Sequence, residues 1–97
     1  MAAEKNFENR IKAFLKEQGC YFVKYFGCAF TQSGVPDLLV CCNGRFLGVE
    51  VKAENGKLSE LQKHNLEQIR KAGGIALTVK PSDFEDFKQA IRDLKGV

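Results

Sequence analysis

The sequence has no long run of uncharged, apolar residues. Its longest stretch without a charged side chain covers residues 25–36, and glycines and polar residues interrupt that stretch. A helix needs about 20 consecutive apolar residues to cross a membrane, so no membrane-spanning segment is expected. The first residues, Met-Ala-Ala-Glu-Lys-Asn, also lack the apolar core of a secretory signal. We therefore expect a cytoplasmic protein.

Histidine is almost absent, and the cysteines have no metal-binding spacing. The chain contains one histidine, His64, and four cysteines, Cys20, Cys28, Cys41 and Cys42. No Ser/His/Asp or Cys/His arrangement of a nucleophilic hydrolase is supported, and His64 is expected on a partly exposed helix. The cysteines match no CxxC pattern, so we expect free thiols in a reducing compartment. A zinc site that includes His64 and a pair of disulfides are the alternatives.

The overall composition is that of one globular domain. The chain has 97 residues, of which 44% are hydrophobic and 28% are charged. No linker, internal repeat or low-complexity segment divides it, so we expect a single domain over residues 1–97. The formal net charge of +3 is compatible with a nucleic-acid partner but does not establish one.

Apolar spacing and turn residues predict three helices and four strands. Helices are expected over residues 4–18, 59–72 and from residue 82 onward, and strands over residues 20–26, 37–42, 45–52 and 75–79. Ser59 with Gln62, and Ser82 with Glu85, have capping-box spacing at the starts of the second and third helices. The helix between the third and fourth strands implies a crossover, so the sheet should be mixed.

The dipeptide Asn43-Gly44 predicts a tight hairpin whose register brings charged groups together. A two-residue turn there places Asp37 directly opposite Glu50, and Lys52 lies on the same face two residues further along. A bulge near Pro36 would shift this register by one residue. The opposite face is apolar and should point to the core; it carries Leu38, Val40, Cys42, Leu47, Val49 and Val51.

Two carboxylates placed in this way repel each other. At about 5 Å and an effective dielectric of about 20, Coulomb's law gives a repulsion of about 3 kcal/mol. Lys52 offsets part of that cost, and a divalent cation such as Mg²⁺ or Mn²⁺, which takes oxygen ligands, would offset more. The alternative is a plain Asp/Glu/Lys network on the surface of the sheet.

Three segments together resemble a known signature. Gly34-Val35-Pro36-Asp37, Glu50-Val51-Lys52 and the Gly-Lys-Leu-Ser-x-x-Gln run over residues 56–62 resemble the VRR-NUC domain of the PD-(D/E)XK nuclease superfamily, in its small stand-alone bacterial and phage form. The resemblance implies an α/β fold: a restriction-endonuclease-like αβββαβ core with a mixed four-stranded sheet and an extra C-terminal helix. It also implies the cytoplasm of a bacterial or phage-infected cell.

The resemblance further implies a metal-dependent nuclease. Asp37, Glu50 and the main-chain carbonyl of Val51 would bind one or two Mg²⁺ or Mn²⁺ ions, and Lys52 would orient the attacking water. Hydrolysis of the phosphodiester bond would leave a 5′-phosphate and a 3′-hydroxyl. In this family an acid on the first helix often lies near the metal, which here indicates Glu8, and Gln62 would touch water or phosphate. An exposed helix acid and a purely capping glutamine are the respective alternatives.

The expected substrate is branched DNA, and the resemblance implies that a homodimer cuts it, as in Holliday-junction resolvases. Candidate phosphate contacts are Lys24, Arg45, Lys57 and Lys63, although each is also a plausible solvated side chain. Phe26, Phe30 and the third helix are candidates for the dimer interface. A nicking or restriction-like nuclease and a catalytically inactive DNA-binding module are the alternative functions.

Overall fold

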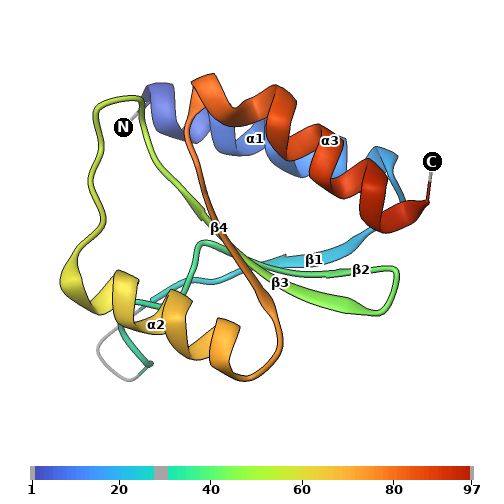
Figure 1. Ribbon diagram of the computed structural model, residues 1–97. Coiled ribbons are helices and arrows are strands. Elements are labelled where there is room, and N and C mark those ends of the chain that lie inside the picture. The colour runs from blue at the N-terminus through green and yellow to red at the C-terminus, as the bar shows by residue number, and fades with distance from the viewer. Residues whose placement is uncertain (1, 28–30, 97) are drawn as a thin grey trace.

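The computed structural model describes residues 2–27 and 31–96 and contains the predicted elements in the predicted order (Figure 1). The helices are α1 (Ala2–Glu17), α2 (Glu60–Lys71) and α3 (Phe84–Lys95), the last preceded by a short 3₁₀ turn, η1 (Pro81–Asp83). The strands are β1 (Tyr21–Lys24), β2 (Leu38–Cys42), β3 (Arg45–Val51) and β4 (Ile75–Val79).

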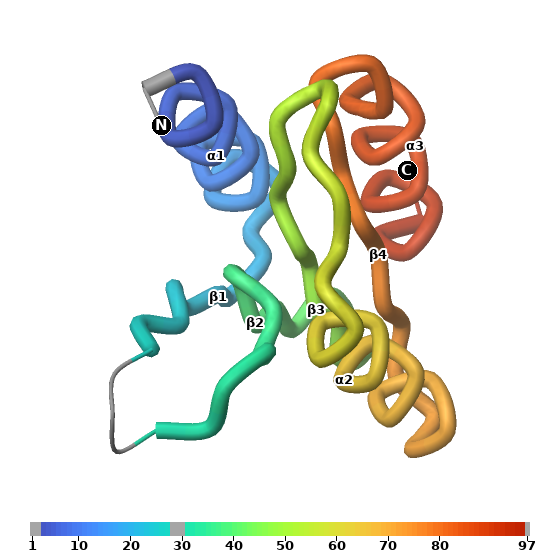
Figure 2. Tube along the Cα trace, turned by 90° about the vertical axis from the view of Figure 1, so that its left-hand side faces the viewer, coloured from blue at the N-terminus to red at the C-terminus, as the bar shows by residue number. Residues whose placement is uncertain are grey.

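The four strands form one mixed sheet in the order β1-β2-β3-β4. β1 with β2 and β2 with β3 are antiparallel, whereas β3 with β4 is parallel because α2 carries the chain back to the start of the sheet. Helices α1 and α3 lie side by side on one face, and α2 lies on the other (Figures 1 and 2). The prediction of a mixed sheet is confirmed.

The β2–β3 hairpin has the predicted turn and register. Asn43 and Gly44 both have positive φ angles, 52° and 79°, as a two-residue type I′ turn requires. Leu38 pairs with Val49 and Cys42 with Arg45, so the register is the predicted one and no bulge shifts it within this ladder. Leu38 is the first residue of β2 in this ladder. Asp37, which precedes it, therefore lies at the open end of the hairpin, next to the paired residues.

The core fills the space between the sheet and the α1/α3 layer. The predicted apolar face of the hairpin is buried there and meets apolar residues of both helices; the cluster includes Phe7, Ile11, Phe14, Leu15, Leu38, Val40, Cys42, Leu47, Val49, Val51, Val79, Phe84, Phe87 and Ile91. The apolar stripe of α3 is thus used within the domain, where Phe84 makes edge-to-face contacts with Phe7 and Phe14.

Helix α2 packs closely on the second face because β3 carries a glycine beneath it. A Cβ atom at Gly48 would lie 2.6 Å from Ile69 Cδ1 and 3.0 Å from Pro36 Cγ. The absence of a side chain allows α2 and the segment before Asp37 to meet over the strand. This contact joins the last turn of α2 to the middle of β3, two residues before Glu50.

Two details of the sequence-based prediction are wrong. The strand expected over residues 20–26 is limited to β1 (Tyr21–Lys24), because the chain turns away after its last contact with β2. Ser82 and Glu85 form no capping box: the Ser82 amide and hydroxyl both donate to Glu54, while Asp83 accepts from the Lys80 amide at 3.0 Å. A 3₁₀ turn therefore precedes α3 and shifts its start to Phe84.

The three cysteines in the described part of the chain form no disulfide. Cys20, Cys41 and Cys42 are free thiols, and Cys28 lies outside the described residues. Burial and a hydrogen bond with Cys42 raise the pKa of Cys20 to about 11, so this thiol stays protonated at neutral pH. His64 is exposed on α2. Within residues 2–27 and 31–96, no helix is long and apolar enough to cross a membrane.

Candidate active site

Asp37 is held rigidly at the mouth of the hairpin. It follows Pro36, which is fully buried, and its main-chain carbonyl accepts a 2.9 Å hydrogen bond from the Tyr25 amide. Its Oδ2 atom accepts a 2.8 Å hydrogen bond from the Val51 amide on the neighbouring strand. One carboxylate oxygen is thus fixed by main-chain geometry, and Oδ1 is the oxygen left to face the site.

Glu50 is a buried acid with an unsatisfied oxygen. Its side chain projects from β3, the residue is only 2% exposed, and Oε2 has no hydrogen-bond partner among the described residues. Burial, followed by a hydrogen bond with Asp37 and the Asp37 charge, raises the pKa of Glu50 to about 9, although Lys52 and Lys24 oppose the shift. Without a bound cation, the raised pKa favours the protonated form of Glu50 at neutral pH.

This pair of carboxyl groups fits a divalent cation. A buried, unpartnered carboxyl oxygen is costly, and a hard cation such as Mg²⁺ both supplies the missing partner and favours the ionised form. Across residues 2–27 and 31–96, no three His, Cys, Asp or Glu side chains gather to hold a metal. A metal would therefore rely on Asp37 and Glu50, and the carbonyl of Val51 as a further ligand stays a prediction.

Glu8 is close to the site but is already paired. It is 9% exposed, and its Oε1 atom lies 2.8 Å from Lys24 Nζ, which in turn lies 3.5 Å from Asp37 Oδ1. Lys12 approaches the other oxygen of Glu8 at 3.4 Å. Burial lowers the pKa of Lys24, but its bond to Glu8 and the charge of Asp37 outweigh that effect and leave it raised. Lys24 was predicted as a phosphate contact, and its bridge between Glu8 and Asp37 was not predicted.

Lys52 and Gln62 lie on the α2 side of the acid pair. The amide of Lys52 donates to the Val79 carbonyl at 3.1 Å, which fixes its backbone. The charge of Lys52 opposes the rise in the pKa of Glu50. Gln62 completes the predicted capping box: its Oε1 accepts from the Ser59 amide at 2.9 Å, and its own amide donates to Ser59 Oγ at 3.1 Å. The capping role of Gln62 is confirmed, and a role in catalysis stays a prediction.

A basic hollow lies beside the acid pair. It has a volume of about 360 Å³ and is lined by Gly56, Lys57, Leu58, Lys63, Thr78 and Lys80. Thr78 is the neighbour of Glu50 in the β3–β4 ladder, which connects the hollow to the site. Lys57 and Lys63 were predicted as phosphate contacts, whereas Lys80 was missed. The signal was available, because the parallel register that pairs Val51 with Val79 also brings Lys80 to the end of the sheet that carries Lys52.

The remaining predicted contact, Arg45, lies far from the acid pair. It is exposed and pairs with Cys42 next to the turn, at the opposite end of the hairpin from Asp37. At about 3.3 Å per residue, that end is roughly 17 Å away. Any contact of Arg45 with DNA would therefore involve a phosphate remote from the one that is cut.

Asn65 anchors the loop that leads to Asp37. This residue of α2 is 8% exposed; its Oδ1 accepts from Gln32 Nε2 at 2.9 Å, and its Nδ2 donates to the carbonyls of Ser33 at 3.3 Å and Leu61 at 3.0 Å. Next to the anchored loop lies a hollow of about 420 Å³ that reaches Asp37. Sequence analysis missed Asn65, although a polar residue beside Leu66 and Ile69 on the apolar side of a helix is a recognisable signal.

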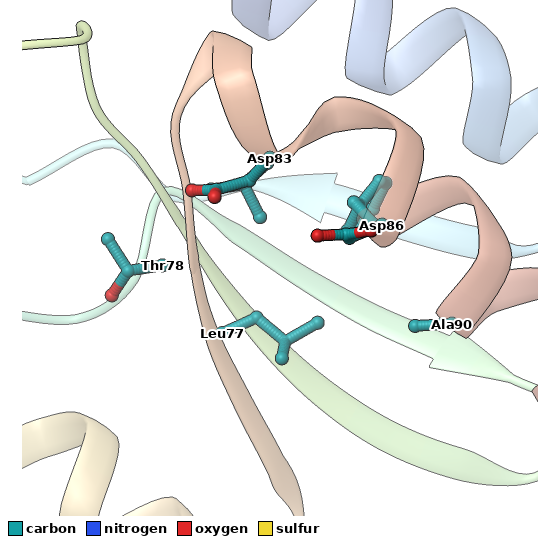
Figure 3. Close-up of a pocket in the computed structure, with 7 residues that line it drawn as sticks. Leu77, Thr78, Asp83, Asp86 and Ala90 are labelled. Carbon is teal, nitrogen blue, oxygen red and sulfur yellow. The ribbon is translucent and has the colours of Figure 1, made fainter.

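A second hollow, between β4 and α3, shares Thr78 with the basic one but has the wrong charge for DNA. It measures about 220 Å³ and combines apolar residues with two acids, Asp83 and Asp86, whose carboxylates lie above Leu77 (Figure 3). Like charge would repel a phosphate backbone from this rim. The basic hollow and the acidic one therefore distinguish the two sides of β4.

Comparison with known families decides the classification. The VRR-NUC domain model matches residues 27–82, more than half of the chain. This chain belongs to the VRR-NUC domain family. The matched region includes Asp37, Glu50, Lys52 and Gln62, whereas Glu8 lies before it. The protein therefore carries a nuclease domain of the PD-(D/E)XK type, as the three sequence segments predicted.

The VRR-NUC chain also shares its fold with a solved structure. It is similar to Hjc of Archaeoglobus fulgidus, described as a Holliday junction resolvase from an archaeal hyperthermophile, with a TM-score of 0.60 and 22% sequence identity. The match covers 79% of this chain and 69% of Hjc. The restriction-endonuclease-like fold prediction is thus confirmed. No curated protein matches the sequence.

Proposed function

We propose that this VRR-NUC protein is a Mg²⁺- or Mn²⁺-dependent endonuclease that resolves branched DNA as a homodimer. The observation that carries the proposal is the buried, unpartnered Oε2 of Glu50 beside Asp37. Two neighbouring carboxyl groups, one of them buried, destabilise the fold, and a bound cation would offset that cost. The likeness to Hjc supports a junction as substrate through the fold alone.

The chain's own residues divide the task. Asp37 and Glu50 hold the cation, which when bound would stabilise negative charge on the phosphate and lower the pKa of a water molecule. Lys52 orients that water and offsets phosphate charge. The capping box uses Oε1 of Gln62, so its amide nitrogen is the atom that would donate to a phosphate oxygen. Cleavage leaves a 5′-phosphate and a 3′-hydroxyl.

The basic hollow would bind the DNA strand on one side of the acid pair. Lys57, Lys63 and Lys80 line it beside the Glu50 strand, so phosphates next to the scissile one would be neutralised there. The acidic rim formed by Asp83 and Asp86 limits the path on the other side of β4. Because phosphate contacts dominate, binding should weaken steeply between 50 and 200 mM salt, by up to about 10³-fold for six contacts.

A homodimer would supply the two sites that paired cuts require. The sheet face beneath β1 and β2 is not covered by α2, and Tyr21, Val23 and Phe46 expose 72%, 42% and 46% of their surface. These side chains, rather than the buried stripe of α3, provide apolar area for a two-fold contact. Phe26 is 76% exposed and stays a candidate, while Phe30 lies outside the described residues.

Cleavage of matched DNA substrates tests the proposal. A labelled four-way junction, a flap and a linear duplex are compared with Mg²⁺, Mn²⁺ and EDTA, using Asp37→Asn as the inactive control. We expect paired cuts in opposed strands of the junction, slow cutting of duplex and no cutting in EDTA. Equal rates on junction and duplex would indicate a nicking or restriction-like nuclease instead. DNA binding without metal-dependent cutting would indicate an inactive binding module.

Sedimentation tests the assembly separately. The proposal expects a mass of twice 10.8 kDa at micromolar concentration. Val23→Glu places a charge on the exposed sheet face and should give a monomer that still folds. A wild-type protein that sediments at the monomer mass would exclude the homodimer but leave the nuclease assignment standing.

A further inference from the structure

Lys24 occupies a position that a cation would otherwise take. Its ammonium lies 2.8 Å from Glu8 Oε1 and 3.5 Å from Asp37 Oδ1, and its side chain is 24% exposed. It therefore joins an acid of α1 to an acid at the mouth of the β2–β3 hairpin. Two carboxylate partners, one on α1 and one at the start of β2, hold the ammonium in this position.

The contact determines which oxygens are available to a divalent ion. Asp37 Oδ2 accepts from the Val51 amide, and Glu50 Oε2 has no hydrogen-bond partner among the described residues, so Asp37 and Glu50 would hold one ion between them. A second ion between Asp37 and Glu8 would need Glu8 Oε1 at about 2.0–2.1 Å, the usual distance to Mg²⁺. Lys24 Nζ already contacts that oxygen.

We propose that Lys24 takes the place of a second divalent cation, so that the site binds one ion, between Asp37 and Glu50. The proposal rests on the metal-dependent function proposed above and defines it further. Glu8 is then a positioning residue: it holds the Lys24 ammonium against Asp37 and binds no metal. Three acids, Glu8, Asp37 and Glu50, would then hold only one ion, because the positive charge of Lys24 from β1 replaces the second.

Counting bound ions tests this directly. Mn²⁺ binding to the full chain is titrated at neutral pH by electron paramagnetic resonance of the free ion, with the melting temperature followed in parallel. Wild type should bind one ion. Lys24→Met should bind two, because the oxygens of Glu8 and Asp37 that Lys24 contacts become available together. Lys24→Arg, which keeps a cation at this position, should return to one.

Lys12 offers the matched control. It also contacts Glu8, at 3.4 Å, but no interaction joins it to Asp37 in the part of the chain that the structure describes. Lys12→Met should therefore leave the count at one. If Lys24→Met melts below the assay temperature, Lys24→Gln replaces it, since its neutral amide removes the positive charge while keeping a polar side chain at this position.

The outcomes separate the inference from the function on which it rests. Two ions bound to wild type, or one ion bound to the Lys24→Met and Lys24→Gln variants, would overturn the role of Lys24 while leaving metal-dependent cleavage intact. No Mn²⁺ bound to wild type at millimolar concentration would overturn both. A second ion gained equally by Lys12→Met would show that loss of any positive charge is sufficient, and would also overturn the specific role of Lys24.

Discussion

Asp37 Oδ2 accepts a 2.8 Å hydrogen bond from the main-chain amide of Val51, which ties the start of β2 to the end of β3. The same residue therefore serves folding through one oxygen and the site through the other. Asp37→Asn can keep this bond through its carbonyl oxygen, whereas Asp37→Ala cannot. The two substitutions separate the structural role from the catalytic one.

Both substitutions should abolish Mg²⁺-dependent cleavage of the junction. Asp37→Ala should in addition lower the stability by about 1–3 kcal/mol relative to Asp37→Asn, because the buried Val51 amide loses its acceptor. Chemical denaturation in EDTA gives the comparison. Equal stability of the two variants would show that the hydrogen bond contributes nothing measurable.

Glu50→Gln should stabilise the metal-free protein in a pH-dependent way. The pKa of Glu50 is about 9 in the folded state against an ordinary value of 4.5, so the folded protein binds the extra proton between these limits. Stability therefore falls as pH rises from 4.5 to 9, and the neutral amide removes that loss. In EDTA the gain in melting temperature should be near zero at about pH 4 and grow up to about pH 9. A gain that is constant with pH would contradict the shift.

Lys52→Ala should impair catalysis without impairing folding or DNA binding. Loss of the group that orients the attacking water should slow cleavage by about 10²–10⁴-fold. Lys16→Ala, which removes the same charge from the exposed last turn of α1, is the control for general electrostatics. Single-turnover rates on saturating junction DNA make the comparison. A Lys52→Ala rate within about twofold of the control would remove Lys52 from the mechanism.

Gly48→Ala should destabilise the domain by overpacking the contact under α2. The new Cβ atom would lie 2.6 Å from Ile69 Cδ1, and relief of such a clash typically costs about 1–3 kcal/mol. Ile69→Val shortens the side chain that causes the clash and should recover part of the loss in the double variant. Additive effects in this double-mutant cycle would mean that Ile69 is not the limiting contact.

The sequence specified the hairpin and its acid pair because both depend on local rules. Asn43 and Gly44 determine the turn, the turn determines the register, and the alternation of side chains then places Asp37 and Glu50 on one face. The family match over residues 27–82 covers this same segment. The prediction was therefore strongest where the chain distance between interacting residues is short.

The Glu8–Lys24 bridge could not be predicted in the same way. It depends on how α1 lies across the sheet, which is decided by core packing around Phe7 and Ile11 rather than by any local spacing. The capping box expected at Ser82 failed for a similar reason. A distant acid, Glu54, competes for the serine, and no pattern within the third helix indicates that contact.

The two-residue turn at Asn43-Gly44 also has a consequence for the order of folding. A hairpin of this kind closes in about 1–10 μs, whereas the parallel pairing of β3 with β4 must wait for the α2 crossover to form. Asp37 and Glu50 therefore meet early, while water still hydrates both, and docking of α1 brings Glu8 to Lys24 later. The acidic pair is therefore expected to be the first part of the site to assemble.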